Sequence, residues 1–133
     1  MSLIVITPPT AEPVTLAEVR THTRLDSIAD DTALAGYIIA ARELAEHELQ
    51  RSLIARTYEL LLDAFPQGSI ELPMAPIPAQ GALSVTSVKY DDTANIEQTV
   101  NSTTYTLDPY SDVPRIQSLT GWPTAKSAIN AVR

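Results

Sequence analysis

The sequence predicts an α+β fold, with a helical part first and a part rich in short antiparallel strands after it. Three observations support this prediction. A helix-capping motif stands near the N-terminus, a long amphipathic segment follows it, and past Leu53 β-branched and aromatic residues replace the helical pattern. We expect a single domain over residues 1–133, with an extended arm at 1–13, a helical part at 14–54 and a β-rich part at 55–133.

A capping box predicts where the first helix begins. Thr15 is followed three residues later by Glu18, and Val14 and Val19 occupy the positions of a hydrophobic staple. The arm before this motif, residues 1–13, carries three prolines, which together with their preceding residues favour extended backbone. We therefore expect a short helix directly after Thr15 and an arm that can lie along another surface.

The second helix is the longest element that the sequence predicts. From Asp31 onward, apolar residues recur at steps of three or four, at Leu34, Ile38, Ala41, Ala45 and Leu49. Asp30 and Asp31 suit the positive N-terminal end of a helix dipole, and Arg51 suits its negative C-terminal end. Charged residues lie between the apolar ones and predict a charged helix face.

Short strands are predicted in the second half of the chain, each bounded by turn residues. The candidate segments are 57–62, 69–72, 83–90, 96–100, 105–107 and 115–119. A stiff connector that contains Pro73, Pro76 and Pro78 separates the second segment from the third. Residues 129–133 look like the beginning of a further strand.

Composition excludes several classes of function. Sixteen acidic and nine basic residues give a net charge of -7, which disfavours binding to a phosphate backbone. The sequence has no cysteine, so disulfides, thiolate metal sites and cysteine nucleophiles are excluded. Its four glycines build neither a phosphate-binding loop nor a nucleophile elbow. The apolar run at 3–6 is too short for a signal peptide or a membrane span, and we expect a cytosolic protein.

One cluster could bind a metal. Glu43, Glu46 and His47 lie within about one helical turn and would offer oxygen and nitrogen donors to a divalent ion, as in a small metal-dependent enzyme. An exposed Glu-His pair is more often a weak charge pair, and a metal site needs three or four convergent ligands. The pairs Asp30-Asp31 and Asp91-Asp92 are better explained as helix-capping and turn residues. We expect no catalytic residue, no metal and no cofactor.

The order of these features resembles the opening of phage head-tail connector proteins. The resemblance rests on the succession of segments 13–19, 24–26, 31, 39–43, 51–60, 65–66, 70–73, 83–92, 105–108, 114–116 and 122–123. It spans nearly the whole chain.

The resemblance implies a structural subunit and not an enzyme. Such subunits form a ring at the head-tail interface of the virion, between the portal protein and the tail or stopper protein, after assembly in the bacterial cytoplasm. DNA passes through the channel of the ring. Members of the family continue past a segment like 131–133 into a further strand and C-terminal helices, so we expect a truncated product in which portal binding is most affected. The alternative is a tail-completion or baseplate adaptor.

Two surfaces are predicted to make protein contacts. Arg42, Glu46 and Arg51 offer both signs of charge and are expected to contact a neighbouring subunit, because a ring needs complementary patches. The alternative for these residues is a solvated helix face. The second surface is the loop of Asp91, Asp92, Thr93, Ala94 and Asn95. Exposed loops on a sheet concentrate binding, so we expect this loop to reach a partner. Trp122 is expected to be either an interface anchor or a packing residue.

Overall fold

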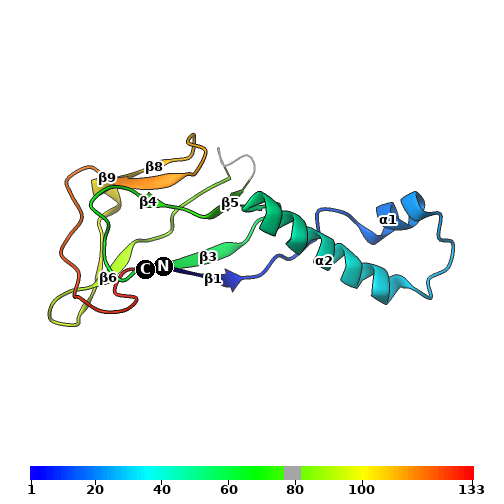
Figure 1. Ribbon diagram of the computed structural model, residues 1–133, viewed down its shortest axis with the longest axis horizontal. Helices are drawn as coiled ribbons and strands as arrows, with labels where there is room; N and C mark the ends of the chain where they lie inside the picture. The colour runs from blue at the N-terminus through cyan, green and yellow to red at the C-terminus, as the bar shows by residue number, and fades with distance from the viewer. Residues whose placement is uncertain (77–81) are drawn as a thin grey trace.

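The chain is elongated, with its two helices at one end and most of its strands at the other (Figure 1). The computed structural model describes residues 1–76 and 82–133. Its elements are β1 (Ser2–Thr7), α1 (Leu16–Thr23), α2 (Asp31–Leu49), β2 (Arg51–Ser52), β3 (Thr57–Leu61), β4 (Ile70–Glu71), β5 (Met74–Pro76), β6 (Lys89–Asp91), β7 (Glu97–Thr99), the 3-10 helix η1 (Ser102–Thr104), β8 (Tyr105–Asp108) and β9 (Arg115–Ser118). The predicted α+β fold is confirmed.

The predicted capping box opens α1. The Thr15 hydroxyl accepts a hydrogen bond from the Glu18 N–H at 3.2 Å, and the Glu18 carboxylate accepts one from the Thr15 N–H at 2.7 Å. These bonds satisfy two of the amides that a helix start leaves without partners. The hydrogen bond from the Thr15 N–H also lowers the pKa of the Glu18 carboxyl below its ordinary value. The helix ends at Thr23, and the next residue, Arg24, caps it with a left-handed backbone at φ 57°.

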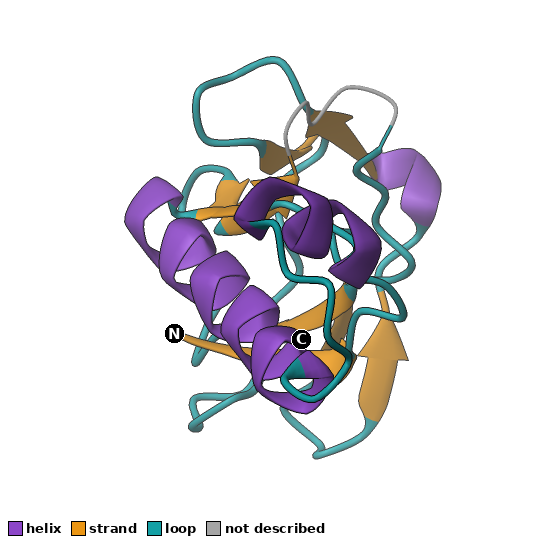
Figure 2. Cartoon of the chain, turned by 90° about the vertical axis from the view of Figure 1, so that its right-hand side faces the viewer, coloured by secondary structure: helices purple, strands orange, loops and turns teal. Residues whose placement is uncertain are grey.

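The second helix has the predicted bounds but not the predicted faces. Leu34, Ile38 and Ala45 are half-buried, whereas Ala41 and Leu49 are exposed. The residues that the structure describes as buried on α2 are both charged, Arg42 and Glu46. Figure 2 shows both helices in front of the strands. Among the described residues, no helix is long and apolar enough to cross a membrane.

The strands of the described residues form four small sheets. Strand β1 pairs antiparallel with β3, β2 pairs parallel with β5, β9 lies between β4 and β8, and β6 pairs with β7. Part of the predicted extended arm is therefore β1, and part of the predicted proline connector is β5. Pro78 of that connector lies outside the described residues.

The other strand predictions are confirmed with shifted bounds, except for one segment. Residues 83–90 were expected to form a continuous strand, but only the end of that segment enters a ladder, as β6. The part before it alternates half-buried Leu83 and Val85 with exposed neighbours and has no ladder partner among the described residues. Side-chain alternation alone could not show that a partner strand is missing.

The core lies in the β-rich part. Ile70, Val88, Val100 and Ile116 form its buried cluster. Val132 is 1% exposed and makes isolated bridges to Leu62 and Tyr90, so only a bridge residue forms where the sequence predicted the beginning of a strand at 129–133. Burial of these apolar side chains stabilises the β-rich part.

Candidate functional site

A largely buried group of charged side chains joins α2 to the arm before α1 and to the segment that leads into β3. Arg42 donates from Nε to Glu12 at 2.7 Å and from Nη1 to Glu46 at 2.8 Å. Glu46 also accepts from Arg56 Nη2 at 2.6 Å and from the Leu53 backbone N–H at 2.8 Å. The group therefore connects the arm before α1, the second half of α2 and the segment that leads into β3. We call these four side chains, Glu12, Arg42, Glu46 and Arg56, the charged network.

The network favours the charged forms of Glu46 and Arg42. Burial by itself raises the pKa of the Glu46 carboxyl, but the Leu53 N–H and the two arginines outweigh burial and hold this pKa below its ordinary value. The hydrogen bond to Glu12 raises the pKa of Arg42 above its ordinary value. Buried charges are tolerated when they are paired and hydrogen-bonded, and that condition is met here.

The residues that were predicted to form an exposed charged face lie mostly inside the structure. Arg42 and Glu46 are 6% and 2% exposed, so the expectation that they belong to an open charged face is wrong. Their partners Glu12 and Arg56 are remote in sequence, and helical spacing carries no signal for them. Arg51 is half-buried and donates to the backbone carbonyl of Asp112. Contact of Arg42, Glu46 and Arg51 with a second subunit stays a prediction.

Strands β6 and β7 form a hairpin whose tip is the predicted contact loop. Asp91 is the last residue of β6, where its carboxylate pairs with Lys126 and with Arg133, each at 3.0 Å. The hydrogen bonds from these two cations lower the pKa of Asp91. Asp91 therefore fastens the hairpin to residues 126–133 of the same chain.

The turn itself is shaped by Asp92. One carboxylate oxygen of Asp92 accepts from the N–H groups of Ala94 and Ile96, at 2.8 and 3.0 Å. Asn95 has a left-handed backbone with φ 61°, which asparagine tolerates better than most residues. Thr93, Ala94 and Asn95 are exposed. The strand-loop-strand arrangement is as predicted, and the role of the loop in partner contact stays a prediction.

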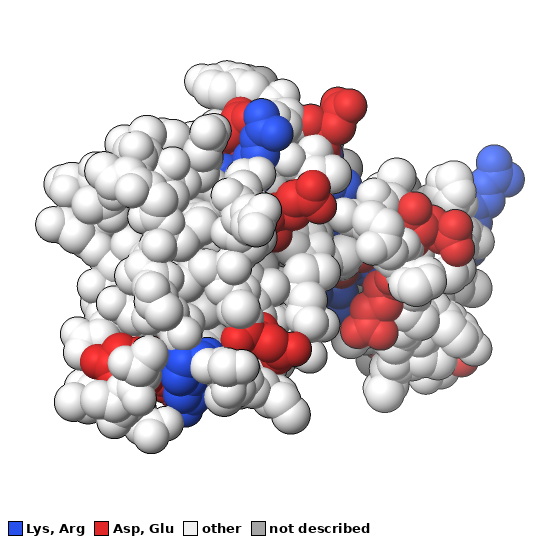
Figure 3. Space-filling view, turned by 60° about the vertical axis from the view of Figure 1, so that its left-hand side comes forward, with Lys and Arg blue, Asp and Glu red and all other residues white. Residues whose placement is uncertain are grey.

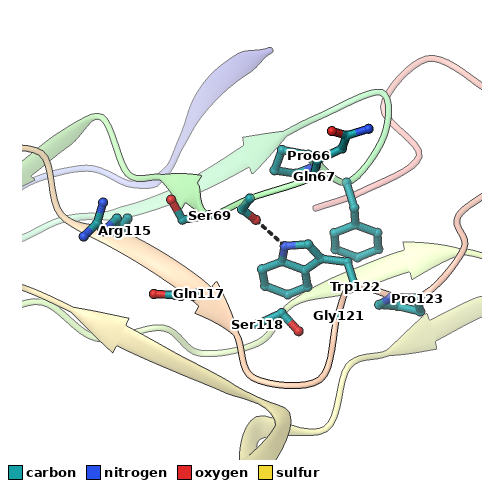
Figure 4. A pocket seen from close by; sticks show the side chains of 11 residues that line it. Pro66, Gln67, Ser69, Arg115, Gln117, Ser118, Gly121, Trp122 and Pro123 are labelled. Carbon is teal, nitrogen blue, oxygen red and sulfur yellow. Dashed lines mark hydrogen bonds between the residues drawn. The ribbon is translucent and has the colours of Figure 1, made fainter.

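Trp122 packs within the chain. Its ring stacks on Phe65 with centroids 5.0 Å apart and planes 6° apart, and its indole N–H donates to the Gly68 carbonyl at 2.8 Å (Figure 4). A cavity of about 520 Å³ lies beside it. Among the described residues that line this cavity, Arg115 is the ionisable one, so they do not supply the acid and base that proton-transfer catalysis needs. Of the two roles considered for Trp122, the structure shows the packing role.

The proposed metal ligands do not converge. Glu46 points into the charged network, whereas Glu43 has a side chain that is 65% exposed and His47 is exposed. No group of three or more candidate metal ligands occurs in residues 1–76 and 82–133. On the face shown in Figure 3, basic side chains are scattered, and most of them lie beside acidic ones.

Comparison with known proteins identifies the family. The family model for phage gp6-like head-tail connector proteins matches residues 13–116. The chain belongs to this family. Head-tail connectors are structural proteins, and this membership gives the chain a structural connector role.

A solved structure is similar over the whole chain. It is described as the neck of an empty GTA particle computed with C6 symmetry, and a chain of it matches at 30% sequence identity and a TM-score of 0.74. The match covers 100% of this connector chain and 67% of the other chain. No curated protein sequence matches the connector chain.

Proposed function

We propose that the chain is one subunit of a homo-oligomeric ring at the head-tail junction of a phage-like particle. In this proposal the portal protein lies on one side of the ring and a tail or stopper protein on the other. The observation that carries the proposal is the similarity, over the full chain, to a protein of a neck that was computed with six-fold symmetry. Family membership over residues 13–116 supports the same role independently.

The charge of the chain fits a ring through which DNA passes. A subunit with a net charge of -7 does not grip phosphates, because DNA affinity depends on basic side chains that release counterions. The charged network uses Arg42 and Arg56 internally, which removes two of the nine basic residues from the surface. A channel surface that weakly repels DNA would let the DNA pass without binding it.

The tip of the β6–β7 hairpin is the proposed contact with a partner ring. Asp92 and the left-handed Asn95 fix the shape of this tip before binding, so little conformational entropy is lost when it docks. Arg51 contacts the loop before β9 within its own chain and remains a proposed charged contact with a neighbouring subunit. A shortened hairpin that still binds its partners with full affinity would contradict the first assignment.

Native mass spectrometry over a range of concentrations tests the proposal. The chain is measured alone, with the portal protein of the same phage and with the tail-tube protein of the same phage. Rings of identical subunits, together with capture by the portal protein, are the expected result. Capture by the tail-tube protein alone would favour a tail-completion or baseplate adaptor. A chain that remains monomeric and binds neither protein would contradict both roles.

A further inference from the structure

The outer side of α2 carries a line of apolar residues. Ala33, Tyr37, Ala40 and Leu44 follow one another at steps of four, three and four, so they lie on one line along the helix. All four are exposed, with Tyr37 at 70% and Leu44 at 63%. Helical geometry places them on the side opposite Ile38 and Arg42. We call these four residues the α2 ridge.

The ridge stands out because α2 buries two of its charged residues, Arg42 and Glu46, while it exposes these four apolar residues. Single exposed apolar side chains are common on soluble proteins, but an aligned set on one helix is typical of an interaction surface. The ridge itself contains no charged residue, although each copy of the chain carries a net charge of -7. Copies with the same charge repel each other, and an uncharged contact keeps that repulsion low.

A second apolar surface lies in the strand-rich part. It is a groove of about 750 Å³ between β1, the segment that leads into β3, and residues 82–88. Its lining is mainly apolar and includes Leu3, Ile6, Leu53, Leu83 and Val85. Five charged residues also line it, namely Arg56, Glu59, Lys89, Glu97 and Arg133. Ile6 and Leu53 are exposed at 55% and 38%, so the groove is open to solvent at these two residues.

We propose that the α2 ridge of one copy packs into this groove of the next copy around the ring. The inference rests on the proposed function and assigns the two surfaces of its subunit contact. A ring of identical subunits needs two different patches that fit each other, whereas a patch that fits itself gives a closed dimer. The chain offers one convex and one concave apolar surface, built from different elements, and so meets that requirement.

Photo-crosslinking identifies the neighbour of the ridge. The chain has no cysteine, so Leu44→Cys introduces a unique site for a benzophenone maleimide label. Leu119→Cys is the matched control, because Leu119 is 63% exposed, as Leu44 is, and lies directly after β9. We expect label at position 44 to crosslink to peptides of a second copy that contain residues 53–60 or 82–88, and label at position 119 to give no such product.

Assembly of charged variants tests the same contact without a label. Leu44→Asp should raise the concentration for half-assembly at least about tenfold, which is about 1.4 kcal/mol, and Leu119→Asp should leave it unchanged. Circular dichroism checks that both variants are folded. If Leu44→Asp assembles into rings as readily as the wild-type chain, and label at position 44 gives no crosslinks, the ridge assignment is overturned and the proposed function stands. Crosslinks to another site of a second copy, or to a partner protein alone, would overturn the pairing with the groove. A wild-type chain that never self-associates would overturn the ring itself.

Discussion

Replacing Glu46 by glutamine tests whether the charged network stabilises the fold. The substitution keeps the shape of the side chain but removes the charge that faces Arg42 and Arg56. In the folded protein three donors reach this carboxylate, namely Arg42 Nη1 at 2.8 Å, Arg56 Nη2 at 2.6 Å and the Leu53 N–H at 2.8 Å. After Glu46→Gln the two guanidinium groups stay in place, with side chains that are only 5% and 10% exposed.

The expected loss is large compared with the stability of a chain of this size. Removing one partner of a buried ion pair destabilises a protein by about 3–5 kcal/mol. A glutamine oxygen in the place of Oε1 still accepts the hydrogen bonds from the Leu53 N–H and from Arg56, so we expect the lower end, about 3 kcal/mol. Domains of this length are typically stable by about 10 kcal/mol, and roughly a third of that would be lost.

Urea unfolding at pH 7 measures the effect, with circular dichroism for the helices and Trp122 fluorescence for the β-rich part. A loss of about 3 kcal/mol lowers the midpoint by roughly 1–2 M. The control is Glu43→Gln on the same helix. The Glu43 side chain is 65% exposed and lies 3.6 Å from Arg42, so its change should stay within about 0.5 kcal/mol. If the unfolding free energies of the two variants differ by less than about 1 kcal/mol, the network does not stabilise the fold.

The remaining predictions concern pH, a helix cap, a turn and the stacked tryptophan. The pKa of Glu46 lies below its ordinary value of 4.5, so its stabilisation is present above about pH 4.5 and is lost as pH falls through the lowered pKa. The gap in unfolding free energy between wild type and Glu46→Gln should therefore be constant from pH 7 to pH 5 and shrink in acid, and a gap that grows would contradict this sign. Thr15→Ala removes the acceptor of the Glu18 N–H and should weaken α1 by about 1 kcal/mol, seen as faster amide exchange in that helix alone. Asp92→Ala should speed exchange of the Ala94 and Ile96 amides, and unchanged rates would mean that Asp92 does not shape the turn. Trp122→Phe keeps an aromatic ring against Phe65 but loses the bond to Gly68, for an expected cost of about 1 kcal/mol by circular dichroism.

Local signals in the sequence predicted the elements well. The capping box at Thr15 and Glu18 is present as expected, and α2 has the predicted bounds because periodicity and end charges agree. Strands β3, β4, β7 and β9 lie within their predicted segments, and β8 extends one residue past its own. Each of these features is set by residues that are close to one another in the sequence, so a single sequence is enough to predict it.

The orientation of α2 and the pairing of β1 with β3 depended on distant residues. Arg42 and Glu46 point inward because Glu12 and Arg56 meet them, and neither partner belongs to the helix. Residues 2–7 were expected to be an extended arm, but they gain a ladder only because β3 lies beside them. Periodicity shows that a helix has two faces but not which face the rest of the chain covers. For the same reason the α2 ridge was not identified from the sequence.

The segment at residues 57–62 obtains its partners at different times during synthesis on a ribosome. Its β3 residues pair with β1, which has already left the ribosome when β3 emerges. Leu62, directly after β3, must wait for Val132 before its bridge can form. Contacts between residues so far apart in the chain close slowly, whereas α1 and α2 need only local contacts. The helices can thus be complete in the nascent protein while the apolar end of this segment still lacks its last neighbour, and a chaperone that binds the nascent chain would find its site there.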